Sequence, residues 1–297
     1  MLNNNKIISG TELSNEIKEN IKNKVDEIVA KYNKKPCLAV IIVGNNPASQ
    51  VYVKNKEKAC AKCNIDSLKY ELPETTTESE LIELINKLNI DEKVNGILVQ
   101  LPLPKHINEK KIMNLILPEK DVDCFNPINI GNMIIGDYDF EKSMLPCTPK
   151  GCIKLIKKAI GNNLTGKKAC IIGRSNIVGK PVAQLLLHEN CTIKIIHSKT
   201  KNIAEEIKWA DIIVVAIGKP KFLTKDMISE NCIVIDVGIN RTENGLCGDS
   251  DYENILDKVS YITPVPGGVG PMTIASLMEN VFNAFLKQNK INNKNSL

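Results

Sequence analysis

The stretch Ile171-Ile172-Gly173-Arg174-Ser175-Asn176-Ile177-Val178-Gly179-Lys180-Pro181 places a glycine turn between an expected strand and an expected helix. Backbone amides at such a turn, and at the N-terminus of the following helix, would face a pyrophosphate. The stretch departs from the usual GxGxxG, because Ser175 stands where the second glycine would be and Gly179 comes one residue late. Taken alone, the motif is also compatible with a tight turn that binds nothing.

Apolar segments of strand length alternate with helical patterns on both sides of this turn. Such alternation predicts a doubly wound parallel sheet, in which the phosphate-binding loop follows the first strand, and the glycine turn has that position. We expect strands at 169–172, 192–196, 212–216 and 233–237 and helices at 182–188 and 203–209.

The first half of the chain shows the same alternation. Apolar residues at helical spacing predict a helix over 11–32, and the β-branched run at 38–43 is typical of a buried parallel strand. These two segments open a second βαβ arrangement. Helices are expected to follow at 47–63 and 78–88, and strands at 68–72 and 96–100.

Residues 121–149 separate the two halves, because proline and glycine interrupt every period there. We expect a connecting helix at 152–160 and an amphipathic helix at 274–286, followed by a tail, 289–297, without regular structure. The sequence therefore predicts an α/β protein with two domains, residues 1–145 and residues 146–273, of which the second has a Rossmann-type doubly wound sheet.

The end of the next strand after the glycine turn decides which dinucleotide is favoured. An NAD enzyme keeps an Asp or Glu there for the ribose 2′-hydroxyl, whereas this chain has His197, Ser198, Lys199 and Thr200. Ser198 can donate hydrogen bonds to a 2′-phosphate, and Arg174 and Lys199 can supply positive charge. NADP is therefore favoured over NAD. His197 alone gives no reason to assign a catalytic role.

Tyr52 and Lys56 lie four residues apart on the expected helix at 47–63, so both project from one face. That helix starts at the carboxyl end of a parallel strand, and Gln100 ends another strand at the same edge, where α/β sites form. Alone, the pair is more typical of a solvated Lys beside a packed Tyr. If the three groups converge, Lys56 is the acid/base of the set, because burial weakens its preference for the ammonium form and Gln100 cannot titrate.

Asp121 and Asp123 follow in Lys120-Asp121-Val122-Asp123. A carboxylate here could hold a planar, amidine-like heterocycle through paired hydrogen bonds. The alternative is that the two acids only cap a turn.

Composition limits the class of protein. The chain has 297 residues, a formal net charge of +5 and only 4% aromatic residues, which argues against a nucleic-acid surface. A polar start and the lack of an apolar stretch of about 20 residues predict a cytoplasmic protein that does not enter membranes. Its ten cysteines, Cys60 and Cys63 of a CxxC among them, are expected to be reduced thiols without a metal site.

Several separated motifs occur together and in order. They are Tyr52-Val53-Lys54-Asn55-Lys56, Val99-Gln100-Leu101-Pro102-Leu103-Pro104, Pro118-Glu119-Lys120-Asp121-Val122-Asp123, Pro146-Cys147-Thr148-Pro149, Gly173-Arg174-Ser175 and Pro264-Val265-Pro266-Gly267-Gly268-Val269-Gly270-Pro271-Met272-Thr273. With these motifs the chain resembles the bifunctional methylenetetrahydrofolate dehydrogenase/methenyltetrahydrofolate cyclohydrolase family (FolD family). Two features depart from the family pattern: Cys124 stands where the family usually has Gly, and the strand end that bears Lys199 varies in such enzymes.

The resemblance implies a homodimer that oxidises 5,10-methylenetetrahydrofolate with NADP and hydrolyses the product, with folate and NADP meeting between the domains and the helix at 274–288 returning to the first domain. It implies that Lys56 transfers protons, Tyr52 positions the folate, Gln100 tunes Lys56 and Asp123 holds the pterin. Further residues that it assigns to folate are Pro102, Pro264, Gly267 and Gly268, and those that it assigns to the cofactor are Thr148, Gly173, Arg174, Ser175, Ser198 and Ile239.

Two other interpretations predict different behaviour. A monofunctional dehydrogenase using NAD would not need Lys56 with Gln100 for hydrolysis, nor Arg174 with Ser198 for a 2′-phosphate. A nucleotide-binding or scaffold protein without activity would bind cofactor without turnover.

Overall fold

The computed structural model describes residues 6–243 and 245–291, and most of the tail expected to lack regular structure, 292–297, lies outside the described residues. The chain forms two compact units. The first unit comprises Asn15–Cys147 and the chain from Ile274 onward, and the second comprises Thr148–Thr273 with the residues up to Ser14. Each unit is built on its own parallel sheet.

The first unit has a three-stranded parallel sheet in the order β2-β1-β3. The central strand is buried along its whole length, which explains why it reads as a continuous apolar run. The strands are β1 (Cys37–Val43), β2 (Asp66–Leu72) and β3 (Gly96–Val99), and the helices with residues in this unit are α1 (Gly10–Tyr32), α2 (Pro47–Lys62), α3 (Glu78–Ile90), α4 (Glu109–Leu115), α5 (Pro127–Ile135) and α10 (Val269–Gln288).

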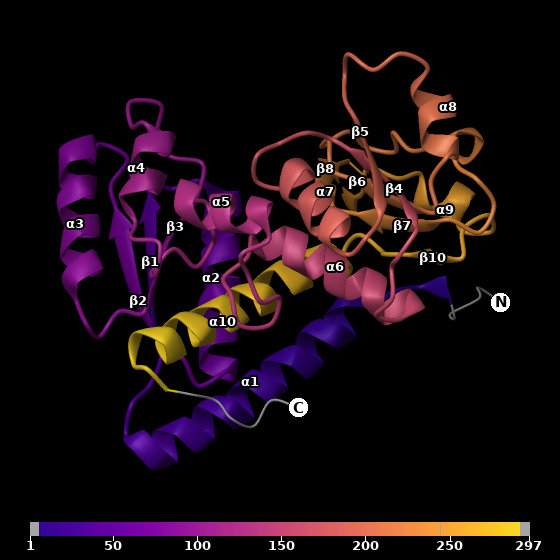
Figure 1. Cartoon of the computed structure of the whole chain (residues 1–297). Helices are drawn as coiled ribbons and strands as arrows, with labels where there is room; N and C mark the ends of the chain where they lie inside the picture. The colour runs from indigo at the N-terminus through magenta and orange to yellow at the C-terminus, as the bar shows by residue number, and fades with distance from the viewer. Residues whose placement is uncertain (1–5, 244, 292–297) are drawn as a thin grey trace. The chain divides into compact units, whose positions relative to one another are not determined.

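Alternate side chains of β1 belong to two different cores, as expected for a strand covered on both faces. Figure 1 shows α3 on one side of the sheet and α2 and α10 on the other. Leu38, Val40 and Ile42 pack with residues of α1, α2 and α10, whereas Ala39, Ile41 and Val43 pack with residues of α3 and α4. The unit is thus a three-layer α/β structure, and its last layer includes the C-terminal helix, as predicted.

The second unit has a five-stranded parallel sheet in the order β10-β7-β6-β4-β5. The chain starts this sheet at β4, adds β5 on one side and then continues with β6 on the other, so a topological switch point lies beside the end of β4. The strands are β4 (Lys168–Ile172), β5 (Thr192–Ile196), β6 (Ile212–Val215), β7 (Ile233–Asp236) and β10 (Tyr261–Ile262); a hairpin adds β8 (Asn240–Thr242) and β9 (Gly245–Cys247), and the helices are α6 (Cys147–Ile160), α7 (Gly179–His188), α8 (Ile203–Lys208) and α9 (Tyr252–Ile255), with a 3-10 turn at Lys225–Met227.

The predicted α/β class and two-domain architecture are confirmed, but two helices begin five residues earlier than predicted. The connecting helix α6 starts at Cys147 and the last helix α10 at Val269. Pro149, one of the prolines that suggested a break, lies in the first turn of α6, where the missing N–H costs no intrahelical hydrogen bond, and Pro271 lies in the first turn of α10.

Two short helices between residues 109 and 136 were not predicted from periodicity. The second, α5, follows a local signal: Asn126 accepts a hydrogen bond from the Ile128 N–H at 2.9 Å, and Gly136 ends the helix at φ 81°.

The start of the chain also differs from the predicted grouping. The Ile8 N–H donates to the Ile262 carbonyl at 2.8 Å beside an isolated bridge between Ile7 and Ile262, so these residues belong with β10 in the second unit.

Candidate functional site

The first polar cluster forms on α2, which begins directly after β1. Asn46 caps this helix by accepting hydrogen bonds from the Ala48 and Ser49 N–H groups at 3.0 and 3.1 Å, and Pro47 occupies the first turn. Val53 of this helix is buried, whereas Tyr52 is 41% exposed and Lys56 is half-buried. Local sequence thus directs both side chains to the carboxyl edge of the sheet.

Gln100 meets Lys56 at that edge, as predicted. Its N–H extends the β3 ladder by donating to the Ile41 carbonyl at 2.8 Å. Its side-chain amide donates through Nε2 to the Leu101 carbonyl at 2.7 Å, which turns Oε1 toward Lys56, and Lys56 Nζ donates to this oxygen at 3.0 Å. Gln100 therefore fixes the direction of the Lys56 amine without titrating.

Asp123 lies in the same electrostatic environment as Lys56. Burial raises the pKa of the Asp123 carboxyl, while the positive charge of Lys56 and a hydrogen bond from the Cys147 thiol oppose this rise. The Cys147 side chain is buried and its Sγ also lies 3.4 Å from the Val122 carbonyl. The contact between Cys147 and Asp123 is not apparent from the sequence motif that contains Cys147.

Asp121, in contrast, holds the loop together. It is 1% exposed and accepts hydrogen bonds from the Asn126 N–H at 2.7 Å and from Asn129 Nδ2 at 3.1 Å. Burial raises its pKa to about 6. Of the two alternatives for this acid, turn capping agrees with the structure.

The neighbours of the two acids explain how the loop keeps its shape. Lys120 is 6% exposed and donates to the Leu88 and Asp91 carbonyls at 2.9 and 2.6 Å. Cys124 has φ 60°, a left-handed conformation that favours glycine, and its N–H donates to the Asp121 carbonyl at 3.1 Å. The turn that a glycine would favour is thus kept with cysteine.

The glycine turn after β4 has the backbone of a phosphate-binding loop. Gly173 has φ 126°, and a Cβ there would collide with the Ala216 carbonyl oxygen at the end of β6. A Cβ on Gly179 would collide with the Gly173 carbonyl oxygen, so the late glycine allows close packing of α7 on the turn. Ser175 Oγ accepts hydrogen bonds from the Val178 and Gly179 N–H groups at 3.2 and 3.3 Å.

The segment after β5 is a tight turn closed on its own backbone. The His197 N–H donates to Thr200 Oγ1 at 3.0 Å, and His197 Nδ1 accepts a hydrogen bond from the Lys199 N–H at 3.1 Å. The histidine therefore stabilises the turn, while Ser198 and Lys199 are exposed. With Arg174 also exposed and no acid from 197 to 200, this edge fits a dinucleotide that carries a 2′-phosphate.

Other predicted cofactor residues lie in the second unit. Thr148 Oγ1 and Thr273 Oγ1 are 2.9 Å apart, and Ile239, after β7, is 46% exposed.

The glycines of the 264–273 loop contact the protein's own backbone. Gly267 has φ 104°, and its carbonyl oxygen accepts a hydrogen bond from the Thr11 N–H at 3.0 Å. A Cβ on Gly10 would collide with the Gly268 carbonyl oxygen. Gly268 is buried and Pro264 half-buried, whereas Pro102 of the first unit is exposed. These two glycines therefore pack closely against the start of α1.

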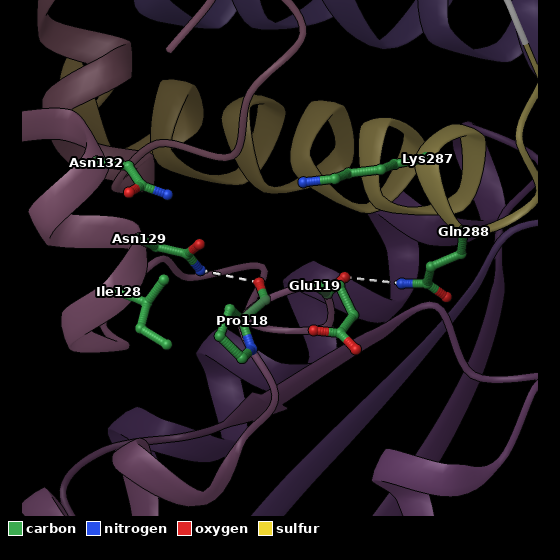
Figure 2. Close-up of a pocket in the computed structure, with 7 residues that line it drawn as sticks. All are labelled: Pro118, Glu119, Ile128, Asn129, Asn132, Lys287 and Gln288. Carbon is green, nitrogen blue, oxygen red and sulfur yellow. Dashed lines mark hydrogen bonds between the residues drawn. The ribbon is translucent and has the colours of Figure 1, made fainter. Parts of the chain in front are cut away.

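A cavity of about 480 Å³ in the first unit does not include the predicted site residues (Figure 2). Figure 2 shows Asn129 Nδ2 donating to the Pro118 carbonyl and Gln288 Nε2 donating to the Glu119 carbonyl. The residues that line the cavity are Pro118, Glu119, Ile128, Asn129, Asn132, Lys287 and Gln288.

Cys60 and Cys63 are buried, and burial raises the pKa of each thiol to about 12. Within residues 6–243 and 245–291, no three His, Cys, Asp or Glu side chains are grouped to hold a metal ion. Over the same described ranges, no helix combines the length and apolar character needed to cross a membrane.

Comparison with known proteins matches two family models. Residues 8–123 match the tetrahydrofolate dehydrogenase/cyclohydrolase catalytic domain, and residues 146–289 match the NAD(P)-binding domain of the same family. The chain is 56% identical over 287 residues to bifunctional protein FolD of Acetivibrio thermocellus, covering 96% of this chain and 99% of the relative. The corresponding protein of Listeria innocua is 51% identical over 287 residues, with coverage of 96% and 99%.

Solved structures of similar fold include enzymes of the same family. The crystal structure of the bifunctional FolD enzyme of Campylobacter jejuni superimposes with a TM-score of 0.91 at 51% identity, covering 95% of this chain and 98% of that one. The Trypanosoma brucei methylenetetrahydrofolate dehydrogenase-cyclohydrolase, solved with NADP cofactor and inhibitor, gives a TM-score of 0.89 at 34% identity, with coverage of 96% and 98%.

Proposed function

Because the chain belongs to the tetrahydrofolate dehydrogenase/cyclohydrolase family, we propose how its residues share the two reactions of that family. The enzyme oxidises 5,10-methylenetetrahydrofolate to 5,10-methenyltetrahydrofolate with NADP and hydrolyses the product to 10-formyltetrahydrofolate. A monofunctional NAD enzyme is not favoured, since the similar relatives are bifunctional.

Lys56 is the proton-transfer residue of the hydrolysis. Water attacks the methenyl carbon and one carbon–nitrogen bond breaks, so one group must take a proton from the water and give one to the departing nitrogen. Among Tyr52, Lys56 and Gln100, we assign both transfers to Lys56, because an amine and its ammonium form are a base and an acid, whereas Gln100 does not titrate. The hydrogen bond to Gln100 at 3.0 Å is the observation that carries this assignment, because it holds Nζ in one direction.

Asp123 and Tyr52 bind the folate in this proposal. The Asp123 carboxylate accepts hydrogen bonds from the amidine-like edge of the pterin, and its partial burial would strengthen them. Tyr52, exposed on the same face of α2 as Lys56, packs on the ligand. Pro102, Pro264, Gly267 and Gly268 complete the folate-binding residues.

In this proposal the glycine turn of the second unit binds NADP, whereas Tyr52, Lys56 and Asp123 of the first unit bind folate. NADP supplies the hydride acceptor, and loss of hydride from a carbon flanked by two nitrogens needs positioning more than a base. The chain's contribution to this step is therefore to hold the cofactor. We assign the phosphates to Gly173, Arg174, Ser175 and Ser198, and the rest of the cofactor to Thr148 and Ile239.

The same proposal includes a homodimer in the cytoplasm whose products supply purine, methionine and histidine biosynthesis. Sedimentation of the purified protein tests the dimer directly, since a single species of one-chain mass would contradict it.

The assay that tests the assignment mixes purified protein with 5,10-methylenetetrahydrofolate and either NADP or NAD, and follows reduced cofactor and then the methenyl product by absorbance. Reduction with NADP followed by conversion to 10-formyltetrahydrofolate is the expected result. Reduction without hydrolysis would remove Lys56 from its role, and reduction only with NAD would contradict the assignment of Arg174 and Ser198.

A further inference from the structure

A buried carboxylate lies where three loops of the second unit meet. Asp249 is 0% exposed and follows the β8–β9 hairpin. Its Oδ2 accepts hydrogen bonds from the Ile217 and Gly218 N–H groups at 2.7 and 2.9 Å, and its Oδ1 accepts from the Lys219 N–H at 2.8 Å and from Asn240 Nδ2 at 2.9 Å. One side chain thus ties the loop after β6 to the segment after β7.

A second buried acid holds Asp249 itself in place. Asp236, 3% exposed at the end of β7, accepts hydrogen bonds from the backbone N–H groups of Gly238, Asp249 and Ser250 at 3.0, 2.9 and 2.7 Å. The two carboxylates leave no room for a side chain at Gly238 or Gly248. A Cβ on Gly238 would collide with the Asp249 carboxylate, and a Cβ on Gly248 would collide with the Asp236 carboxylate.

The loops that Asp249 joins are those beside the glycine turn. β6 is the neighbour of β4 at the switch point, and the Ala216 carbonyl oxygen lies where a Cβ on Gly173 would be. Residues 217–219 therefore continue directly from the contact with the phosphate turn. On the other side, Ile239 lies between Gly238, where a Cβ would collide with the Asp249 carboxylate, and Asn240, which donates a hydrogen bond to that carboxylate.

We propose that Asp249 is a positioning residue for NADP, setting the loop at 217–219 and the segment around Ile239 at the distance that the bound cofactor requires. The inference rests on the proposed placement of NADP in the second unit. Asp249 touches neither cofactor nor substrate in this account, because its two oxygens already accept four hydrogen bonds from the protein.

The chemistry explains why an acid is needed there. All four partners are donors, so an amide at the same position would turn an NH₂ group toward N–H groups that need an acceptor. Asparagine has almost the same shape as aspartate, so Asp249→Asn disturbs only the pairing of acceptor oxygens with these donors. Gly238→Ala disturbs the same carboxylate by contact and leaves its charge unchanged.

The experiment measures both activities of the full-length enzyme for the parent, Asp249→Asn, Gly238→Ala and a control. The control is Asp211→Asn, because Asp211 Oδ2 also accepts a backbone hydrogen bond, from the Lys168 N–H at 2.8 Å, but at the opposite edge of the same sheet. We expect both test variants to raise the KM for NADP about 10-fold or more, with a smaller change in kcat, from the loss of charge-assisted hydrogen bonds.

Hydrolysis of supplied 5,10-methenyltetrahydrofolate is the internal measure of folding, and it should stay at the parent rate in all variants. An unchanged KM for NADP in both test variants, with Arg174→Ala raising it, would overturn the inference alone. An unchanged KM in Arg174→Ala as well would overturn the underlying placement of NADP. A parallel fall of both activities in both test variants would also overturn the inference, since it would indicate a general structural role.

Discussion

The two units use the same edge of a parallel sheet for different purposes. In the first unit, Lys56 of α2 and Gln100, which follows β3, meet there, with Lys56 Nζ 3.0 Å from Gln100 Oε1, and the charge of Lys56 acts on Asp123. In the second unit, the edge is formed by backbone around Gly173, and the buried acids Asp236 and Asp249 accept hydrogen bonds from loop backbone. In our proposal, the first edge supplies the group that moves protons and the second binds the dinucleotide.

The difference follows from the two reactions. Hydrolysis requires a proton carrier at a fixed position, which calls for a lysine with rigid neighbours. Hydride transfer to a dinucleotide requires orientation, which glycine turns and backbone donors provide. If this division is correct, substitutions in one unit should affect one activity far more than the other.

The largest effect is expected for Lys56→Met. Removal of the amine should lower hydrolysis of 5,10-methenyltetrahydrofolate by about 100-fold or more, because no other group of the cluster can both take and give a proton. Part of the dehydrogenase activity should survive, and the methenyl compound should accumulate in the coupled assay. Lys54→Met, an exposed lysine of the same helix, is the matched control and should behave like the parent. A Lys56 variant that hydrolyses at the parent rate would contradict the assigned role.

Arg174→Ala tests the proposed cofactor-binding role of the second unit. Loss of a charge-assisted contact with the 2′-phosphate should raise the KM for NADP by about 10- to 100-fold. The KM for NAD, which has no such phosphate, should change little. Steady-state kinetics with both cofactors give the ratio, and an equal change for NADP and NAD would remove Arg174 from the phosphate site.

Asp121→Asn tests the acid that caps the loop of the first unit. The measurement is the pH dependence of the free energy of unfolding. Burial raises the folded-state pKa of Asp121 to about 6, above its value in the unfolded chain. The folded protein therefore binds this proton more tightly between those two values, and the parent loses stability as the pH rises through about 6.

In urea unfolding followed by circular dichroism, the difference in free energy of unfolding between parent and Asp121→Asn should shift by about 2 to 3 kcal/mol in favour of the parent from pH 7 to pH 4. A difference that stays constant over this range would show that Asp121 is not the titrating group.

The smallest effect is expected for Cys124→Gly. Glycine would relieve the left-handed conformation at φ 60°, worth about 1 kcal/mol, but would remove a buried side chain whose Sγ lies 3.3 Å from the Met144 carbonyl. These terms oppose each other, so stability should change by less than about 1 kcal/mol and the KM for folate should stay the same. A clear fall in this KM would show that cysteine turns Asp123 away from its productive direction.

The features that could be predicted from the sequence are those set by local patterns, such as buried strands and the edge at which they end. The buried run of β1 and the rule that parallel strands end at one edge were enough to predict that Lys56 and Gln100 would meet. The early start of α6 was missed because a proline in a first turn resembles a break when only periodicity is considered.

Other features depend on contacts between distant segments. Asp121 and Asp123 are two residues apart and chemically identical, and only the folded chain shows that one caps the loop while the other lies beside Lys56. Asp249 could not be identified from its neighbours in sequence, since its partners at 217–219 lie 30 to 32 residues away.

The most direct test of the division between the units is the ratio of the cyclohydrolase rate to the dehydrogenase rate at a fixed, subsaturating NADP concentration, measured in Lys56→Met and Asp249→Asn. We predict that the ratio falls in Lys56→Met and rises in Asp249→Asn. A ratio that moves in the same direction in both variants, or in neither, would contradict the account.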